Sequence, residues 1–308
     1  MENESTDIRY EEAARLLPPR FRAAACAFPD WKKMQVEEFR LRAGHLPTAL
    51  TAEGEFTLPY FGADGMLTTR DLEQMVDLLT ESSRYACSET LRQGYLMLRG
   101  GFRLGLCGSA VMRGGNCTDL REFSSLALRI PRECCGVSDT VVGELFDAGR
   151  FQSTLIFSPP GGGKTTLLRD MIRNLSDGTA NRPALRVGVI DERGELAATV
   201  KGAAQMSLGC HTDVLDGIGK AAGIEMLLRT MNPQVIAADE ITAREDIAAL
   251  LHAANCGVAL LATIHAANLA ELKRKPLYHN MAAANVFLRV VEIVQEHEKR
   301  SYRVGEFR

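Results

Sequence analysis

The sequence predicts an α/β protein of two domains, and two changes of pattern along its 308 residues are the basis for this. From Phe151 onward, short apolar runs alternate with helical segments, which is typical of a mainly parallel sheet covered by helices on both faces. Before that point, helices mix with short strands of alternating polarity, which favours an α+β fold. We expect an N-terminal α+β domain over 1–136, a linker helix over 137–150 and an α/β domain with a mainly parallel sheet over 151–308.

The first domain is expected to begin with helices and a hairpin. Thr68-Thr-Arg-Asp71 has the spacing of a capping box, in which two side chains accept hydrogen bonds from free backbone N–H groups at the start of a helix. Pro18-Pro19 interrupts a helical pattern, because proline lacks the N–H that continues a helix. In chain order the expected elements are a helix over 10–27, a strand over 36–42, a hairpin over 48–59 with its turn near Glu53-Gly54, and helices over 68–83 and 85–93.

A pair of glycines organises the rest of this domain. Apolar runs lie on both sides of Gly100-Gly101 within 94–108, which predicts a tight turn between antiparallel strands. A further strand is expected over 125–130, ended by Pro131. A helix over 138–146, closed by Gly149, then leads into the second domain.

The second domain is expected to contain four strands that are apolar throughout. Such strands are buried on both faces and belong to the interior of a parallel sheet. A helical segment over 165–175 follows the first of them. The strands are expected over 154–157, 186–190, 235–238 and 258–264, with a closing pair over 286–295 and 301–307 around 297–300.

Composition argues against several classes of protein. The formal net charge of -3 argues against a general nucleic-acid binder, because that class carries a basic excess. The 8 cysteines include no Cys-x-x-Cys pair, so we expect reduced thiols that pack as small core residues rather than zinc ligands. Residues 1–9 are acidic and polar, unlike a secretory signal, and the most apolar window, 258–264, is too short to cross a bilayer. We therefore expect a cytoplasmic protein without direct membrane insertion.

A glycine-rich loop carries the strongest chemical signal. Ser158-Pro-Pro-Gly-Gly-Gly-Lys-Thr-Thr166 lies between an apolar strand and a helical segment, which is the context of a phosphate-binding loop. Its glycines let backbone N–H groups turn toward phosphate oxygens, and the helix N-terminus adds the positive end of its dipole. Ser158 stands where the usual pattern has glycine, a position that shapes the turn more than it contacts phosphate. Lys164 is expected to reach the β- and γ-phosphates of ATP, and the Thr165 hydroxyl to bind Mg²⁺. The residues expected to hold the nucleotide are Pro160, Gly161, Gly162, Gly163, Lys164, Thr165 and Thr166.

The second signal is Val235-Ile-Ala-Ala-Asp-Glu240, an apolar strand that ends in two acids. Asp239 is expected to hold Mg²⁺ through its water shell, and Glu240 to orient and polarise the attacking water. Acids at the end of a buried strand are common on their own. Behind a phosphate loop, the pair predicts ATP hydrolysis.

Two further strand ends carry candidate residues. Asp191 and Glu192 follow the strand over 186–190, and His265 ends the strand over 258–264. Ligands bind at the carboxyl ends of strands in open α/β sheets, so these three residues are candidates for nucleotide contacts. A solvated loop is the alternative for Asp191 and Glu192. His265 is either a structural histidine or a sensor of the γ-phosphate.

The order of these motifs resembles that of the ATPases of type II and type IV secretion systems and of pilus motors. Those proteins carry a phosphate loop, an acidic box, an acidic strand end with glutamate, and a histidine box. The resemblance implies a RecA-like P-loop ATPase core that binds ATP and Mg²⁺ and assembles as a homo-hexamer. The matching segments are 158–166, Asp191-Glu192, Asp239-Glu240 and 263–266.

The N-terminal half resembles the same family in part. Ser125-Leu-Ala-Leu-Arg-Ile-Pro131 is similar to a strand that supplies a nucleotide-contacting arginine, here Arg129, with Arg132 as an alternative. The hairpin that contains Arg103 is similar to the strand that supplies another. The resemblance implies that these arginines act on nucleotide bound by the same subunit. The alternative is that they are solvated strand residues.

Nearly the whole chain resembles the stage III sporulation AA family, a sporulation relative of these ATPases. This resemblance implies an ATPase in the mother cell of a spore-forming bacterium, serving a secretion-like channel to the forespore. It also implies recruitment to the outer forespore membrane by a membrane protein similar to stage III sporulation protein AB. The features that carry it are Glu38-Phe-Arg-Leu-Arg42, Leu91-Arg-Gln-Gly-Tyr95, 158–169, Val189-Ile-Asp-Glu-Arg193 and 213–217.

Two other functions stay open. A scaffold that binds ATP without hydrolysing it would have no need of Glu240. A nucleic-acid-stimulated ATPase of helicase or translocase type also uses a phosphate-loop core. Its basic face would be made by Arg99, Arg103, Arg113, Arg121, Arg129 and Arg132.

Overall fold

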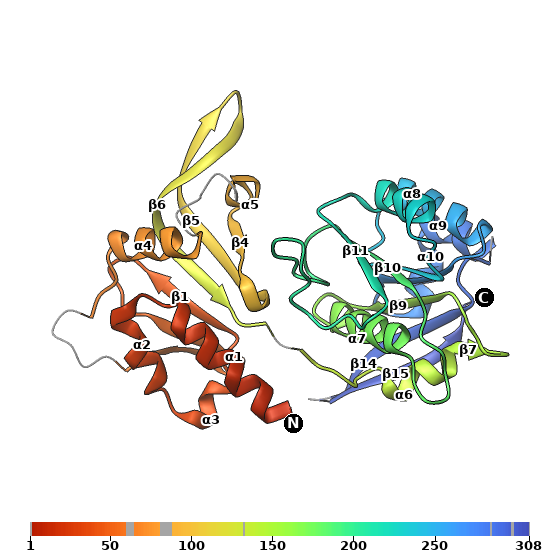
Figure 1. Ribbon diagram of the computed structural model, residues 1–308, viewed down its shortest axis with the longest axis horizontal. Coiled ribbons are helices and arrows are strands. Elements are labelled where there is room, and N and C mark those ends of the chain that lie inside the picture. The colour runs from red at the N-terminus through yellow and green to blue at the C-terminus, as the bar shows by residue number, and fades with distance from the viewer. Residues whose placement is uncertain are drawn as a thin grey trace. The chain divides into compact units, whose positions relative to one another are not determined.

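The computed structural model describes residues 2–59, 65–80, 88–131, 133–283, 285–296 and 299–307. The chain divides into two compact units, Met1–Arg132 and Glu133–Arg308, drawn in Figure 1. Each unit has a sheet and a hydrophobic core of its own.

The first unit is built on an antiparallel sheet of six strands in the order β3-β2-β1-β6-β5-β4. The helix break at Pro18-Pro19, the 48–59 hairpin and the capping box are confirmed. The helix that the box opens ends at Leu79, and 81–87 lie outside the described residues. The elements are α1 (Glu2–Leu16), α2 (Pro19–Cys26), α3 (Asp30–Lys33), β1 (Glu38–Arg42), β2 (Thr48–Thr51), β3 (Gly54–Thr57), α4 (Thr69–Leu79), α5 (Ser88–Arg92), β4 (Tyr95–Met97), β5 (Arg103–Arg113) and β6 (Asn116–Arg129).

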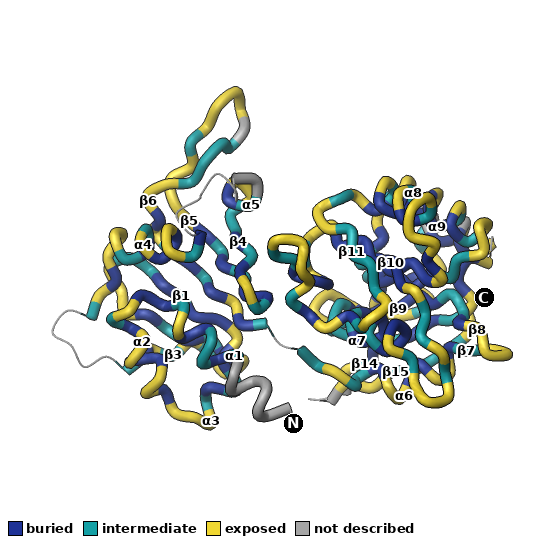
Figure 2. Tube along the Cα trace, in the orientation of Figure 1, coloured by how far each residue is buried: buried dark blue, intermediate teal, exposed yellow. Residues whose placement is uncertain are grey.

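Strands β5 and β6 are much longer than the sequence predicts. We expected a strand only from Ser125, but β6 begins at Asn116 and pairs with β5 along an arm that extends beyond the rest of its sheet (Figure 1). The arm is mostly exposed (Figure 2) and turns at Gly114-Gly115, where both φ angles are positive. Because both faces of the arm meet solvent, its sequence lacks the alternation of polarity that reveals a half-buried strand.

The second unit is built on a seven-stranded sheet in the order β11-β10-β12-β13-β9-β14-β15. All neighbouring strands are parallel except the last pair, β14 and β15, which confirms the mainly parallel α/β sheet. The elements are α6 (Asp139–Val142), β7 (Phe146–Asp147), β8 (Arg150–Phe151), β9 (Thr154–Ser158), α7 (Lys164–Asp177), β10 (Val187–Asp191), β11 (Thr212–Asp216), α8 (Lys220–Thr230), β12 (Val235–Ala238), α9 (Arg244–Asn255), β13 (Ala259–His265), α10 (Leu269–Arg274), α11 (Pro276–Ala283), β14 (Arg289–Glu296) and β15 (Lys299–Glu306).

Two expectations for this unit are corrected. The helix expected over 138–146 is wrong in extent, because α6 has four residues and is followed by a 3₁₀ turn and the β7–β8 hairpin. Gly143 ends the α-helical stretch, and Ala148 and Gly149 both take positive φ in the hairpin turn. The edge strand β11 was not predicted, because its partly exposed residues lack the apolar run of the interior strands.

The sheet brings the predicted motifs to one edge. Ser158 at the end of β9 pairs in register with His265 at the end of β13, and Ala238 of β12 pairs with Ile190 of β10. Successive residues of β9 enter different cores on the two faces, so the strand is buried on both sides as its apolar sequence predicts. The residues that follow β9, β10, β12 and β13 therefore share the carboxyl edge of the sheet.

Candidate nucleotide site

The loop from Ser158 to Lys164 depends on glycine for both conformation and space. Gly161 and Gly163 have φ of 74° and 92°, a region that residues with side chains rarely enter. A Cβ on Gly162 would lie 2.2 Å from Ser158 Oγ, so only glycine fits between the two arms of the loop. Ser158 fits in place of the usual glycine, because its hydroxyl donates to Pro159 O at 3.0 Å.

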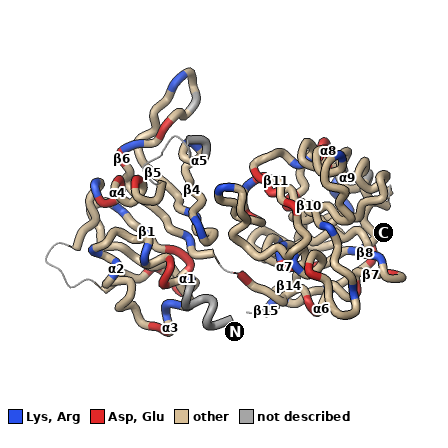
Figure 3. The backbone as a smooth tube through the Cα atoms, in the orientation of Figure 1, with Lys and Arg blue, Asp and Glu red and all other residues tan. Residues whose placement is uncertain are grey.

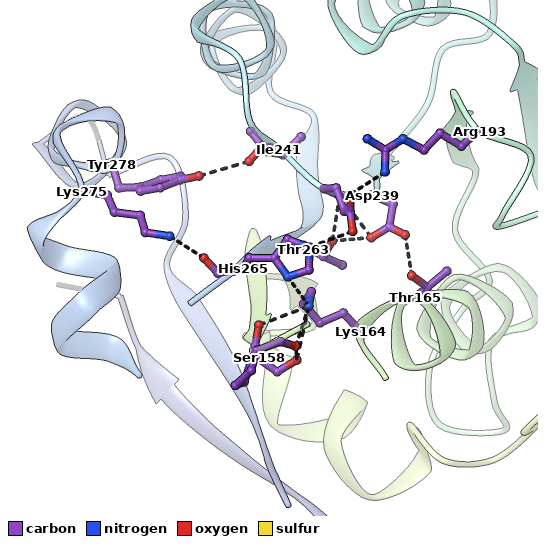
Figure 4. A network of polar contacts seen from close by, with 12 residues as sticks. Ser158, Lys164, Thr165, Arg193, Asp239, Ile241, Thr263, His265, Lys275 and Tyr278 are labelled. Carbon is purple, nitrogen blue, oxygen red and sulfur yellow. Dashed lines mark hydrogen bonds and ion pairs between the residues drawn. The ribbon is translucent and has the colours of Figure 1, made fainter. Parts of the chain in front are cut away.

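Lys164 is the first residue of α7 and is only 4% exposed. Its ammonium group donates to Ser158 O at 3.2 Å and to Pro159 O at 3.1 Å, and lies 2.8 Å from Nδ1 of His265 (Figure 4). Burial lowers the pKa of Lys164, against the opposing charges of Asp239 and Glu240. A buried ammonium held mainly by neutral acceptors would gain from an anion in the loop.

Asp239 follows β12 and is held by two hydroxyl groups. Thr165 Oγ1 donates to its Oδ2 at 2.7 Å, and Thr263 Oγ1 donates to its Oδ1 (Figure 4). The two residues predicted to bind Mg²⁺, Thr165 and Asp239, are therefore adjacent. Among the described residues no cluster of three or more His, Cys, Asp or Glu is present that would hold a metal ion without further ligands. One hydroxyl and one carboxylate fit Mg²⁺, which keeps several waters and takes its remaining ligands from phosphates.

Glu240 is the centre of a polar network. Its Oε1 lies 2.8 Å from Nε2 of His265, and its Oε2 accepts from Arg193 Nη1 at 2.8 Å. Its backbone has a φ of 50°, and its N–H donates to Thr263 Oγ1 at 2.8 Å, which holds this unusual conformation. Burial raises the pKa of Glu240, but the hydrogen bond from His265 and the positive charges of Arg193 and Lys164 outweigh it, so the pKa lies below its ordinary value.

His265 joins the phosphate loop to the acid pair. An ammonium group has no lone pair, so His265 Nδ1 accepts from Lys164. The hydrogen-bond network therefore assigns the ring proton to Nε2, which donates to Glu240. One neutral imidazole thus connects the residue expected to bind the terminal phosphates with the residue expected to polarise water.

Asp191 and Glu192 are at the same edge but have different surroundings. Asp191 is 3% exposed, and its carboxylate accepts from the backbone N–H groups of Glu195, Leu196 and Ala197 at 2.7–3.1 Å. Glu192 forms an ion pair with Lys220, the first residue of α8. Figure 3 shows acidic residues gathered beside β10 and β11. In this arrangement Asp191 holds its own loop together.

The whole chain matches one protein family. The match is to the family described as sporulation stage III, protein AA, and it spans residues 9–306. The chain belongs to this family. Stage III sporulation protein AA of Bacillus subtilis (strain 168) is 34% identical to this family member over 283 residues, which cover 92% of this chain and 90% of that protein. An uncharacterized protein, ycf45 of Cyanidium caldarium, is 25% identical over 161 residues, 49% of this chain and 43% of that protein.

Solved structures of secretion and pilus ATPases have the same fold. The Legionella pneumophila ATPase DotB superposes with a TM-score of 0.60 at 15% identity, covering 94% of this chain and 80% of that chain. The pilus retraction motor PilT, solved with bound ADP, superposes with a TM-score of 0.58 at 17% identity, covering 87% of this chain and 78% of that chain. These matches confirm the predicted fold, an α+β domain followed by a core with the RecA-like fold of those P-loop proteins. None of the described helices of this family member is long and apolar enough to span a membrane.

The arginines predicted to contact nucleotide lie together in the first unit. Arg103 and Arg129 pair directly across β5 and β6, so they share one face of that sheet. Arg129 Nε donates to Glu38 Oε2 at 3.0 Å, and the Arg103 guanidinium lies 4.3 Å from the centre of the Tyr95 ring. All four line a hollow of about 270 Å³. Arg132, the alternative to Arg129, lies outside the described residues.

Sequence reasoning missed two members of the network. Thr263 lies in the segment that resembles a histidine box, but no role was predicted for it, and its hydroxyl holds both Asp239 and the backbone of Glu240. Arg193 follows Asp191-Glu192 without a predicted role, and it binds Glu240 across the sheet edge. A signal was available for Thr263, because a hydroxyl residue inside an apolar strand needs a polar partner.

Proposed function

We propose that this protein is a Mg²⁺-dependent ATPase of the secretion type that works during sporulation. The observation that carries the proposal is the convergence of the Thr165–Asp239 pair, Lys164 and the His265–Glu240 pair at one edge of one sheet. A loop that only happened to contain lysine and threonine would have no reason to meet two acids and a histidine from other strands.

The phosphate chain of ATP would be held by the glycine loop and the start of α7. The N–H groups of 161–166 would surround the phosphates at the positive end of the helix dipole, and Lys164 would bind the β- and γ-phosphates. Thr165 and Asp239 would hold Mg²⁺, which when bound neutralises charge on the phosphate oxygens. Pro160 and Thr166, at the two ends of the loop, would also line the phosphate site.

Hydrolysis would use Glu240 as the group that orients and polarises water. The water oxygen bonds to the γ-phosphorus, the bond from phosphorus to the β–γ bridging oxygen breaks, and Glu240 takes up the proton of the water. The low pKa of Glu240 keeps it ionised and able to accept a hydrogen bond at neutral pH. A γ-phosphate that captures Lys164 would free Nδ1 of His265, so His265 would report the presence of ATP to Glu240.

We further propose that Arg103 and Arg129 stabilise charge on the nucleotide of their own subunit. The proposal rests on the resemblance of their strands and on their shared face of the sheet. Arg129→Ala should lower turnover more than it weakens ADP binding. Mixing Arg129→Ala with Lys164→Ala subunits should restore no turnover, because neither subunit would have both its phosphate-loop lysine and its arginine. Restored turnover in the mixture would show that a neighbouring subunit supplies the arginine.

The cellular setting is proposed from the family. Membership of a sporulation family and the fold of secretion ATPases support a motor for a channel complex between mother cell and forespore. The protein would act as a homo-hexamer in the mother-cell cytoplasm. A membrane protein similar to stage III sporulation protein AB would recruit it to the outer forespore membrane. Asp191 and Glu192 would act on the nucleotide only indirectly, by holding in place the loop after β10 and its link to α8.

The test is phosphate release from Mg-ATP by the oligomeric protein. Lys164→Ala should weaken ATP binding at least ~100-fold, because it removes the main cation on the phosphates. Lys273→Ala, which removes an exposed lysine of α10, is the matched control and should behave as the parent. Parent-like hydrolysis by Lys164→Ala would overturn the assignment of the site.

Two other outcomes would favour other functions. A parent protein that binds ATP but releases no phosphate at any concentration would be a scaffold. Turnover that rises several-fold with DNA or RNA, and loses this stimulation in high salt, would favour a nucleic-acid-stimulated ATPase.

A further inference from the structure

The C-terminal hairpin of β14 and β15 extends past the end of β9. Strand β14 is parallel to β9 and pairs Glu292 with Phe157, yet it continues to Glu296. Arg300 of β15 pairs with Gln295, which lies beyond the last residue of β9. The register therefore carries Arg300 past the carboxyl end of β9, where the phosphate loop begins.

The side chain of Arg300 reaches the loop itself. A Cβ built on Gly163 would lie 3.0 Å from Nη1, 3.2 Å from Cζ and 3.4 Å from Nε of Arg300. Alternation along β15 puts Arg300 on the same face as Tyr302 and Val304, which pack against the core that includes α7. The guanidinium group thus lies beside Gly163, the residue that caps the N-terminus of α7.

The groups around Arg300 favour the binding of an anion. Within the described part of the chain, the guanidinium of Arg300 has no hydrogen bond or ion pair. It lies beside the free N–H groups of a helix N-terminus, which carry partial positive charge. Lys164, one residue beyond Gly163, adds a further cation. Arg300 is exposed and stays charged at any pH that a folded protein meets, so a bound anion would lower the repulsion among these groups.

We infer that Arg300 binds the phosphate chain of the nucleotide, so that the second unit supplies an arginine of its own to the site. This inference rests on the proposed nucleotide site. The planar guanidinium can donate two parallel hydrogen bonds to phosphate oxygens, which a lysine at this position could not do. A side chain at position 163 would displace the guanidinium from this place beside the loop.

The experiment measures the affinity of the full-length protein for ADP and for inorganic pyrophosphate by calorimetry. Arg300→Ala should bind both ligands ~10- to 100-fold more weakly, the scale of a lost hydrogen bond between charged groups. Arg300→Lys should recover part of this loss, because it restores the positive charge but not the planar group that donates two parallel hydrogen bonds. Arg303→Ala is the matched control, since Arg303 is an exposed arginine on the opposite face of the same strand, and should bind both ligands within about twofold of the parent.

The outcomes separate this inference from the proposed function. Equal affinities of Arg300→Ala and the parent for both ligands would overturn the role of Arg300 and leave the ATPase proposal intact. A loss of affinity that Arg300→Lys fails to relieve, together with a lowered urea midpoint, would also overturn it, because the loss would then be structural. If the parent bound pyrophosphate but no ADP, and Arg300→Ala lost the pyrophosphate, the anion site would stand while the ATPase proposal failed.

Discussion

Two neighbouring strands of the second unit end in the same dipeptide and put it to different uses. Ile190 and Ala238 pair in register, so Asp191-Glu192 and Asp239-Glu240 leave the sheet at the same level. Asp239 accepts hydrogen bonds from hydroxyl groups on two other elements, α7 and β13. Among the described residues, the Asp191 carboxylate accepts from N–H groups of its own loop, four to six residues further along the chain.

The two glutamates differ in the same way. Glu240 binds His265, and through that ring it is connected to the lysine of the phosphate loop. Glu192 binds Lys220 at the start of α8, which ties β10 to the next helix. One acid pair therefore faces groups that can respond to a ligand, and the other faces groups that hold the fold. The difference lies in the elements around each strand end, because the dipeptides themselves are identical.

The largest expected effect separates the two glutamates. Glu240→Gln should lower turnover of Mg-ATP at least ~100-fold while ATP binding survives, because the amide keeps the shape and loses the basic oxygen. Glu192→Gln is the matched variant on the neighbouring strand and should change turnover less than about threefold. Steady-state phosphate release with a binding isotherm for each variant gives both numbers. Equal losses in the two variants would mean that both strand ends belong to the chemistry.

The second expected effect separates the two aspartates by stability. Asp191→Ala should lower the free energy of unfolding by about 2 kcal/mol, because it leaves buried N–H groups of its loop without a partner. Asp239→Ala should lower the free energy of unfolding less and turnover more. Two of its partners are hydroxyl groups that can rotate to water or to each other, and its third, the N–H of Glu240, also bonds Thr263 Oγ1. Urea unfolding and phosphate release on the same samples test this. A stable Asp191→Ala protein with impaired Mg-ATP turnover would move Asp191 into the nucleotide site.

The contrast also explains which features of the fold and the site could be predicted from the sequence. The phosphate loop, the succession of strands and helices along the chain and the acids at the strand ends follow from local patterns of polarity and glycine, and these predicted the fold class. Whether Asp191 faces a ligand or its own loop depends on the path of 195–197, which no local pattern reveals. The position of Arg300 depends on how far the β14–β15 hairpin extends past β9. The arm of β5 and β6 is made of exposed residues whose polarity does not alternate, so no pattern predicts it.

The third prediction concerns the hydroxyl that builds the acid pair of β12. Thr263→Val keeps the volume of a fully buried side chain and removes its hydrogen bonds to Asp239 and to the N–H of Glu240. Turnover should fall ~10-fold, the scale of one lost hydrogen bond in a site that must be ordered. Thr154→Val is the control, because Thr154 is equally buried on β9, the strand paired with β13, and within the described segments its hydroxyl bonds only Gln152 O. Equal turnover in both variants would remove Thr263 from the network.

The smallest effect at neutral pH is the most specific test of the link between His265 and Glu240. The pKa of Glu240 is lowered from its ordinary value of 4.5, chiefly through the hydrogen bond from His265 once burial is overcome. Glu240 is therefore ionised at neutral pH, and it gives stability that is complete above pH 4.5 and lost as the pH falls through the lowered pKa. In the parent, the acid limb of kcat/KM that arises from Glu240 should lie below pH 4.5.

His265→Ala removes the donor, so the pKa of Glu240 should rise and the acid limb should move to higher pH. The alkaline side of the profile should keep its shape, because no proton of Glu240 titrates there. His252→Ala is the matched control, since His252 lies 2.7 Å from Glu225 in an exposed histidine–glutamate pair of α8 and α9. Profiles of kcat/KM recorded with circular dichroism at each pH separate titration from unfolding. An acid limb at the same pH in His265→Ala and His252→Ala would mean that His265 does not control the charge of Glu240, and the two strand ends would then differ in geometry alone.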